Sequence, residues 1–268
     1  MNNMSLTDPE LEQLPKKPFT SLETMRFLTE AINSEWFHAV KLGSEVEGNT
    51  LEELAFVRSV FPLVPLRFKI GGCGAKNDIR AAHECGVDYL VLPMAETVYA
   101  LENFIEICQE YRGKYVKAPL ASLNVETVTM VRNLPEFLPY LEAHFTSITI
   151  GRSDLSASLR TDVNSQEVLD NIETILSFVN KNLPHVSLSI GGKITPLSGK
   201  MLCRNFMNRV SFLNTKFAYI NPAEDIEERI SEALIFEIML YYLLYIEGFR
   251  TKEEFTEFSV NNRKRIER

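Results

Sequence analysis

The sequence predicts an α/β fold in which parallel strands alternate with helices. Three observations support this prediction. Apolar runs of strand length recur along the chain, amphipathic stretches of helix length separate them, and the links between the two are short. This alternation is typical of βα units, whose strands lie side by side in a parallel sheet. Seven strands are clear, so the sheet either closes into a barrel with an eighth strand or stays open and doubly wound.

The composition limits the class of protein. Of the 268 residues, 45% are hydrophobic and 24% are charged, which is ordinary for a soluble domain with one large core. The net charge of −8 argues against nucleic-acid binding, because proteins of that class carry a basic patch. We interpret the one basic run, Arg263-Lys264-Arg265, as the solvated end of a helix.

The cysteines and the apolar segments indicate a cytoplasmic protein. The four cysteines lie far apart without a CxxC pair, so neither a zinc site nor a disulfide framework is expected. The first residues are polar and lack the basic and apolar segments of a signal peptide. The most apolar helical stretch, residues 234–246, is too short to span a bilayer and contains Glu237. We therefore expect no membrane segment.

The chain begins with a polar stretch and continues as one domain. Residues 1–18 contain three prolines and are expected to form a flexible arm, with a single domain over residues 19–268. Thr20-Ser21-Leu22-Glu23 has the capping-box pattern, which predicts a helix start. Strand and helix then alternate as far as a long helix over residues 222–247, which Gly248 ends. A short charged helix follows from Thr251.

The strands are expected where short apolar runs end in turn residues. Two of them end just before Glu126 and Asp154, and Phe217–Ile220 or the segment after Lys114 supplies the eighth strand. No strand is followed by a GxGxxG turn, which argues against a dinucleotide fold. The other predicted strands are 37–42, 66–70, 87–92, 186–190 and 210–213. The predicted helices between strands are 49–61, 76–85, 98–111, 128–141, 165–181 and 198–207.

Two carboxylates follow predicted strands directly. Glu126 ends the run Leu-Ala-Ser-Leu-Asn-Val, and Asp154 lies in the turn Gly-Arg-Ser-Asp after a second strand. In parallel α/β folds, ligands bind at the carboxyl ends of the strands. Two carboxylates there make an oxygen-rich site that suits Mg²⁺ or Mn²⁺. The alternative is that each acid only caps a helix or a turn.

Four segments occur in the order and with the residue pattern of a known family. They are Lys69–Ala75, Gly86–Thr97, Asn124–Thr127 and Ile150–Ser158, and the last two are the most specific. Over roughly residues 36–220, the chain resembles the HpcH/HpaI aldolase and citrate lyase β-subunit family, within the phosphoenolpyruvate/pyruvate barrel superfamily.

The resemblance implies a modified (β/α)₈ TIM barrel whose site lies at the carboxyl ends of the strands. It implies that Glu126 and Asp154 hold Mg²⁺ or Mn²⁺, and that Lys69 replaces an arginine that polarises the keto oxygen of pyruvate or a related 2-oxo acid. The substrate carboxylate would be bound by the backbone N–H groups of Gly151, Arg152 and Ser153. A homo-oligomer is expected, in which the long C-terminal helix is exchanged between subunits. The alternative is that this helix packs on its own barrel.

The general base is the least defined part of the expected site. Aldolase members carry an Asp and a His in the loop that corresponds to residues 43–48, and this chain has no His there. Glu45 or Glu47 serves as the base, or both are solvated loop acids. Glu96 either orients metal-bound water from behind the ligands or caps a helix. The chain also departs from close relatives at Gly74 and at residues 214–216, where charged side chains are expected.

Three functions follow from these residues. The leading one is a divalent-metal-dependent carbon–carbon lyase or aldolase that acts through the enolate of pyruvate or a related 2-oxo acid. The departures favour a second, a catalytically degenerate member that serves as a binding or assembly subunit. The third is citrate lyase-like action on an acyl thioester, for which Arg152 would help to hold a carrier arm, although the sequence shows no basic cluster.

Overall fold

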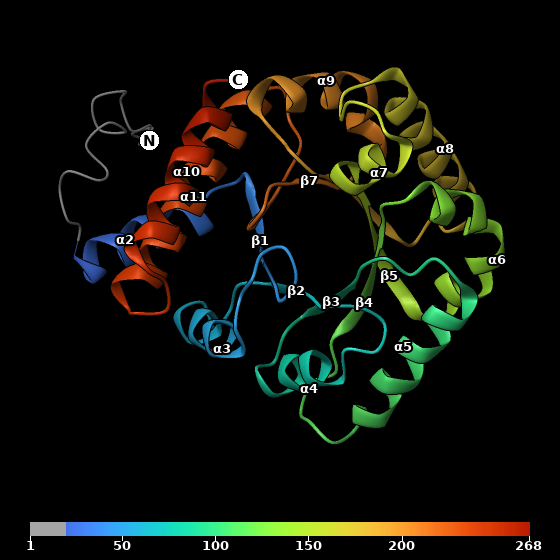
Figure 1. The fold of residues 1–268 in the computed structure, drawn as a ribbon, viewed down its shortest axis with the longest axis horizontal. Helices are drawn as coiled ribbons and strands as arrows, with labels where there is room; N and C mark the ends of the chain where they lie inside the picture. The colour runs from blue at the N-terminus through green and yellow to red at the C-terminus, as the bar shows by residue number, and fades with distance from the viewer. Residues whose placement is uncertain (1–19) are drawn as a thin grey trace.

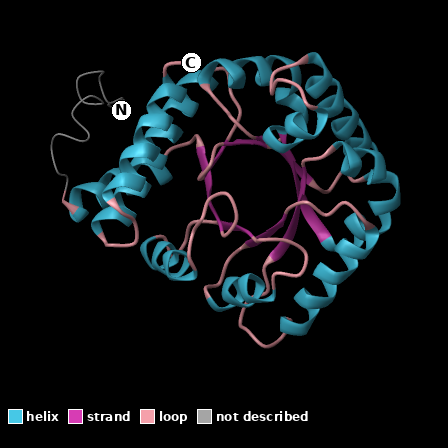
Figure 2. Ribbon diagram, in the orientation of Figure 1, coloured by secondary structure: helices cyan, strands magenta, loops and turns pink. Residues whose placement is uncertain are grey.

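The computed structural model describes residues 20–268, and they build a closed eight-stranded barrel inside a ring of helices (Figures 1 and 2). The strands follow one another around the barrel in chain order. This confirms the predicted α/β barrel and excludes the open, doubly wound sheet. The expected arm, residues 1–18, lies outside the described residues.

Seven strands run parallel to one another. Each pairs in parallel with the next along the chain, from β1 to β7. Their carboxyl ends therefore meet at one end of the barrel. The strands are β1 (Phe37–Gly43), β2 (Leu66–Lys69), β3 (Tyr89–Leu92), β4 (Leu120–Val125), β5 (Phe145–Gly151), β6 (Ser187–Gly191) and β7 (Phe212–Asn214).

The eighth strand differs from the others in direction. β8 (Ala218–Ile220) pairs antiparallel with both β7 and β1, so one of the two predicted segments supplies the strand, but not as a βα unit. Only residues 215–217 separate it from β7. A parallel connection needs a crossover of a dozen or more residues, so a link this short permits only a hairpin.

The helices of the ring begin where the sequence places their caps. Thr20 and Thr50 each form a capping box with the glutamate three residues later, and Thr97 and Thr127 accept a backbone N–H of the first turn. Each cap satisfies a backbone donor that would otherwise have no partner. The helices are α2 (Ser21–Ile32), α3 (Leu51–Val60), α4 (Lys76–Glu84), α5 (Val98–Tyr111), α6 (Val128–His144), α7 (Arg152–Leu159), α8 (Gln166–Asn182) and α9 (Pro196–Phe206), followed by the short helix η1 (Met207–Arg209).

Two helices end the chain. α10 (Ile226–Ile246) is apolar around most of its circumference because α2, α9, α11 and β8 all pack on it. Within one chain α10 packs on its own barrel, and its exchange between subunits stays a prediction. Gly248, at φ +82°, turns the chain into α11 (Lys252–Ile266), which packs back along α10 (Figure 1).

The interior of the barrel is polar along several strands. Arg67 is buried between the rings of Tyr89 and Tyr219, with its guanidinium carbon 3.9 and 4.3 Å from the ring centroids. The Thr149 hydroxyl lies 2.8 Å from the Ser189 hydroxyl and 3.1 Å from that of Tyr219. Barrel interiors are usually filled by branched apolar residues. Here hydroxyl and charged groups lead from the middle of the barrel to its carboxyl end.

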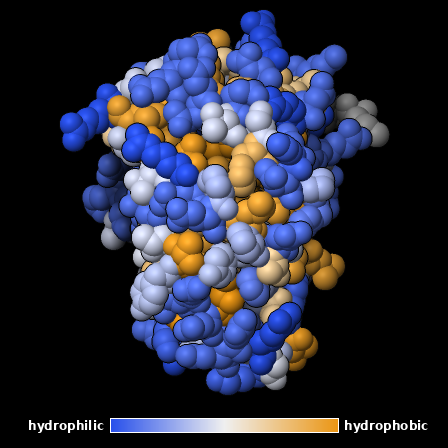
Figure 3. Space-filling view, turned by 90° about the vertical axis from the view of Figure 1, so that its right-hand side faces the viewer, coloured by the Kyte–Doolittle hydropathy of each residue, from blue (hydrophilic) through white to orange (hydrophobic). Residues whose placement is uncertain are grey.

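One face of the outer surface is mostly hydrophilic. On the face over α6 and α8, hydrophilic side chains predominate and apolar ones gather in small separate groups (Figure 3). Among residues 20–268, every helix falls short of the length and apolarity that a membrane crossing requires.

Candidate active site at the carboxyl ends of the strands

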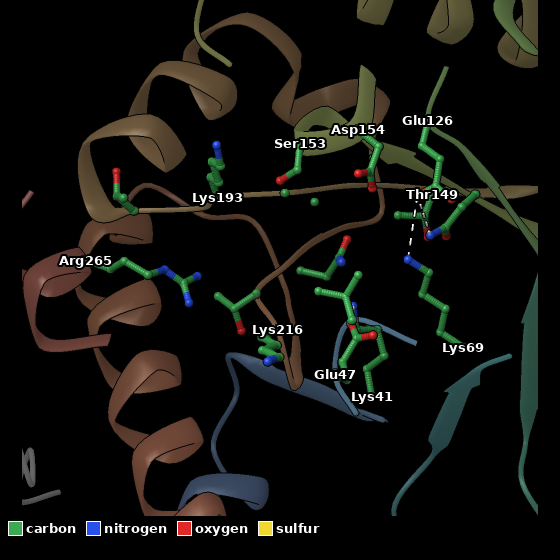
Figure 4. A pocket seen from close by; sticks show the side chains of 18 of the residues that line it. Lys41, Glu47, Lys69, Glu126, Thr149, Ser153, Asp154, Lys193, Lys216 and Arg265 are labelled. Atoms are coloured by element: carbon green, nitrogen blue, oxygen red, sulfur yellow. Dashed lines mark hydrogen bonds and ion pairs between the residues drawn. The ribbon is translucent and has the colours of Figure 1, made fainter. Parts of the chain in front are cut away.

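A cavity of about 630 Å³ opens at the carboxyl ends of the parallel strands. This is the end of a barrel at which ligands bind. Residues of six parallel strands, all except β3, line it together with residues of the loops and of α11 (Figure 4). They include Lys41, Glu47, Lys69, Asn124, Glu126, Thr149, Gly151, Ser153, Asp154, Gly191, Gly192, Lys193, Thr195, Asn214, Lys216, Lys264, Arg265 and Arg268.

Glu126 is the most constrained acid of the cavity. Its side chain is buried, and its two carboxylate oxygens accept hydrogen bonds of 3.1 Å from the Met94 backbone N–H and the Asn124 amide. Met94 has a φ of 50°, which is rare outside glycine. Burial and the neighbouring Asp154 carboxylate raise the pKa of Glu126 to about 7, against the opposing effect of Lys69. The site therefore binds a positive charge at Glu126 more readily than a second negative one.

Lys69 lies between two acids. Its ammonium is 2.7 Å from the Glu45 carboxylate and 4.0 Å from that of Glu126. Burial alone would lower the pKa of Lys69, but the surrounding carboxylates, Glu126 foremost, outweigh it and raise the pKa. Lys69 thus holds a fixed positive charge at the end of β2, where the sequence predicted a cation that faces the substrate.

The two predicted base residues have different surroundings. Glu47 lines the cavity, and its carboxylate lies 2.9 Å from the ammonium of Lys41. Burial alone would raise the pKa of Glu47, but Lys41 and then Lys69 outweigh it and lower the pKa to about 2. A carboxylate so acidic is a weak base at neutral pH. Glu45 is partly exposed and lies beside Lys69, not beside Lys41.

Gly43 explains how Glu47 reaches this position. A side chain at residue 43 would begin 2.5 Å from the Glu47 carboxylate. The glycine at the end of β1 therefore leaves the room that the Lys41–Glu47 ion pair occupies.

Glu126 and Asp154 can serve together as ligands of a divalent cation. Glu126 directly follows β4, and Asp154 lies in the first turn of α7, after the neighbouring strand β5. Both line the cavity, and they lie close enough for the charge of Asp154 to raise the pKa of Glu126. Among residues 20–268, no group of three or more His, Cys, Asp or Glu side chains is arranged for a metal. Mg²⁺ is commonly held by one or two carboxylates, with water and substrate at its other positions. The two acids therefore fit an open site of that kind. They do not fit a site in which protein side chains supply most of the ligands.

The turn after β5 presents backbone N–H groups at the start of α7. A side chain at Gly192 would begin 2.5 Å from the Ser153 nitrogen and 2.9 Å from that of Arg152. The glycine therefore leaves these N–H groups uncovered. Free N–H groups at a helix start favour an anion, as predicted for the substrate carboxylate.

The side chain of Arg152 has a structural role. It is fully buried and donates to the Asn164 side chain at 3.0 Å and to the Gly192 carbonyl at 2.8 Å. It therefore anchors the β6–α9 loop beside the turn and does not line the cavity. The expectation that the Arg152 side chain helps to hold a carrier arm is wrong, and only its backbone remains available to a substrate.

Glu96 lies behind Glu126. Its carboxylate accepts a 2.6 Å hydrogen bond from the Thr127 hydroxyl, and Thr127 caps α6 directly after Glu126. Glu96 is not among the residues that line the cavity. It supports the backbone that carries Glu126, so its effect on a bound metal would pass through Thr127.

Several cations of the cavity were missed from the sequence. The sequence predicts a solvated helix end at the basic run 263–265, but Lys264 and Arg265 line the cavity. Lys193 and Lys216 join them from two loops, so the expectation that there is no basic cluster is also wrong. Lys41 was missed as well, although a lysine in the middle of an apolar strand is a signal for a buried ion pair.

The two sequence departures lie in different places. Asn214 and Lys216 line the cavity, and the Asn214 amide oxygen is buried without a hydrogen-bond partner among the described residues. Gly74 is not among the lining residues, and a side chain there would begin 3.6 Å from the Asn103 amide. The departure at residues 214–216 therefore changes the lining of the cavity, whereas the departure at Gly74 does not.

Comparisons with solved structures agree on the architecture of this chain. An HpcH/HpaI aldolase/citrate lyase family protein from Burkholderia cenocepacia J2315 superposes with a TM-score of 0.57 at 13% identity, over 78% of this chain and 92% of that one. This chain has the fold of the HpcH/HpaI aldolase/citrate lyase family. An HpcH/HpaI aldolase from Desulfitobacterium hafniense DCB-2 matches with a TM-score of 0.56 at 12% identity, over 85% and 90% of the two chains.

A third solved structure with this fold is named citrate synthase SbnG. It matches with a TM-score of 0.56 at 14% identity, over 80% of this chain and 88% of that one. No protein-family model and no curated protein matches the sequence. The resemblance that four motifs predicted is thus confirmed in the fold, while identities this low leave the activity to be argued from the site.

Proposed function

We propose that this protein is a carbon–carbon lyase or aldolase that acts through the enolate of pyruvate or a related 2-oxo acid, with a divalent metal. The observation that carries the proposal is Glu126, a buried carboxylate of raised pKa between Lys69 and Asp154 in a cavity at the carboxyl ends of the strands. The shared fold of lyases and aldolases supports the same reaction class.

Lys69 would stabilise the charge that develops on the substrate. Cleavage or formation of a bond next to a carbonyl passes through an enolate, whose oxygen carries negative charge. A fixed ammonium in a buried position stabilises that charge more than water does. The Glu45 and Glu126 carboxylates, 2.7 and 4.0 Å away, keep the ammonium in place and charged.

Glu126 and Asp154 would hold the metal. A divalent cation held by these carboxylates would supply Lewis acidity toward the bound substrate. The N–H groups of Arg152 and Ser153, which Gly192 leaves uncovered, would bind the far oxygen of the substrate carboxylate. The 2-oxo acid would then lie between the start of α7 and Lys69.

A proton must also move between the substrate and the protein or water. Glu45 is the better candidate for its acceptor, because Lys41 and Lys69 keep Glu47 ionised and weakly basic. Glu45 contacts the ammonium of Lys69 from a partly exposed position, where water has access. The ion pair of Lys41 and Glu47 would shape the floor of the site beneath the substrate.

The test is exchange of the methyl protons of pyruvate with solvent deuterium, followed by NMR with Mg²⁺ or Mn²⁺ present. We expect metal-dependent exchange in the wild type and its loss in Glu126→Gln and in Asp154→Asn. Glu110→Gln is the control, because it removes a carboxylate from an exposed ion pair with Lys76. Exchange that persists in either cavity variant would refute the proposed ligands.

One observation favours a second candidate, a binding protein without catalysis. The only predicted base that lines the cavity is Glu47, and its pKa is about 2. A protein that binds the metal and the 2-oxo acid but exchanges no protons would support this candidate. The expected homo-oligomer is a further proposal, which light scattering on the purified protein tests.

A further inference from the structure

The cavity is divided by charge into two halves. Glu126, Asp154 and Lys69 lie on one side, and Lys193, Lys216 and Arg265 lie on the other (Figure 4). The proposed function uses only the first side. We call the second side the basic subsite, and it consists of Lys193, Lys216, Lys264, Arg265 and Arg268.

The basic subsite is assembled from three separate parts of the chain. Lys193 belongs to the loop after β6, Lys216 to the β7–β8 turn, and the other three to the end of α11. A basic last turn stabilises a helix through its dipole, which explains the cations of α11 alone. It does not explain why two loops place a lysine against the same cavity.

Most cations of the basic subsite have no carboxylate partner among residues 20–268. Of the five, only Arg265 forms an ion pair there, with Glu237 at 3.3 Å. Lys216 lies 5.3 Å from the ring centroid of Phe258, and burial lowers the pKa of Lys216. The chain as a whole has a net charge of −8. The positive charge of the basic subsite is therefore opposite in sign to the charge of the whole chain.

A buried network holds the three parts together. The Glu237 carboxylate accepts hydrogen bonds from the Phe217 backbone N–H at 2.7 Å and from the Asn262 amide at 2.8 Å. Arg265 donates to the Ile194 carbonyl at 2.9 Å. Glu237 therefore joins the β7–β8 turn to α11, and Arg265 joins α11 to the loop that carries Lys193.

The size of the cavity leaves room for a second group. Its volume of about 630 Å³ lies within the range of roughly 300–1,000 Å³ that is typical for ligands of drug size. A three-carbon 2-oxo acid at Glu126 and Lys69 would fill only a part of it. The remaining part is bordered by unpaired cations, which favour a negatively charged occupant.

We propose that the basic subsite binds the anionic end, a phosphate or a carboxylate, of the second substrate. This rests on the proposed function, in which the enolate forms at the opposite half of the cavity. The second substrate would reach from the reacting carbon to Lys193, Lys216 and Lys264. Its reactive end thus meets the enolate, while its charged end sets the specificity.

The test is calorimetric titration of the full-length protein with pyrophosphate and with succinate, in low salt and without divalent metal, since pyrophosphate binds such metals itself. The variant is Lys193→Ala combined with Lys264→Ala, two exposed side chains. The control is Lys181→Ala combined with Lys252→Ala, which removes the same charge from exposed positions outside the cavity.

We expect the wild type to bind at least one probe, more weakly as salt is added. The cavity variant should lose roughly tenfold in affinity for each lysine, the loss expected for a hydrogen bond to a charged group, and the control should retain wild-type affinity. Tighter binding of pyrophosphate supports a phosphate on the second substrate, and tighter binding of succinate supports a carboxylate.

Three results would overturn the proposal. They are the absence of binding of both probes, equal affinities of the wild type and the cavity variant, and displacement of the probe by pyruvate, which would place the probe in the other half. Proton exchange without anion binding would refute the basic subsite and support the proposed reaction. Anion binding without proton exchange would refute the proposed reaction and support the basic subsite.

Discussion

The raised pKa of Glu126 predicts how the stability of the metal-free protein depends on pH. The folded protein holds a proton at Glu126 up to about pH 7, whereas the unfolded chain releases it near the ordinary value of 4.5. Between these values the folded state binds more protons, so its stability falls as the pH rises. The contribution is fully present below about pH 4.5 and is lost as the pH passes about 7.

The size of the effect follows from the same two values. A rise from 4.5 to about 7 corresponds to about 3 kcal/mol, at about 1.4 kcal/mol for each pKa unit. Glu126 as a residue is 1% exposed, so little of this is lost to screening by solvent. Glu126→Gln keeps the hydrogen-bonding shape of the side chain and removes the titration.

Urea unfolding of the wild type and Glu126→Gln at several pH values between about 5 and 8 measures this difference, because all other titrating groups are shared. We expect the wild type to lose up to about 3 kcal/mol relative to the variant across this range. Mg²⁺ should restore the loss in the wild type alone, since a cation favours the ionised carboxylate. A difference that stays constant with pH would refute the assigned environment of Glu126.

Three further predictions concern other parts of the structure. Glu237→Gln should lower the free energy of unfolding by about 2–4 kcal/mol, because it breaks a buried, charged network; an effect below about 0.5 kcal/mol in urea unfolding would contradict this. Gly192→Ala should abolish proton exchange of pyruvate, because residue 192 has a φ of +91° and its new Cβ would lie 2.5 Å from the Ser153 nitrogen. Gly86→Ala is its control, since its φ is +63° and no atom lies within 4 Å, and exchange retained in both variants would argue against the N–H site. Arg67→Met should leave stability unchanged or raise it by about 1–4 kcal/mol in thermal unfolding, because Arg67 is buried without an ion pair among the described residues; a large loss would instead assign a stabilising role to its contacts with the two tyrosine rings.

Much of the barrel could be predicted because local sequence carries its elements. Apolar runs and threonine caps mark where strands end and helices begin, as at Thr50 and Thr127. The direction of β8 was not predicted, because two segments were candidates for the eighth strand and only Ala218–Ile220 has the short link to β7 that requires a hairpin. α7 was missed because Arg152–Leu159 is mostly polar and has no apolar face of helical period.

The site could be predicted only where its residues follow strands. Lys69, Glu126 and Asp154 stand next to strand ends in the sequence, and parallel strands bring such ends together. The basic subsite depends on how α11 packs against the barrel, which is decided by contacts between distant residues such as Glu237 and Asn262. The sequence around Lys264 does not indicate how α11 packs, so the position of Lys264 at the cavity was not predicted.

The antiparallel course of β8 has a consequence for how the protein forms in the cell. Because β8 runs away from the cavity, the chain returns to the carboxyl end of the barrel only through α10 and α11. Chains leave the ribosome from the N-terminus and tend to fold in that order. A nascent chain that has emerged through β8 can pair all eight strands while the wall formed by α11 is still missing. The barrel would then be assembled during translation, and the cavity would acquire its shape only after α11 has emerged.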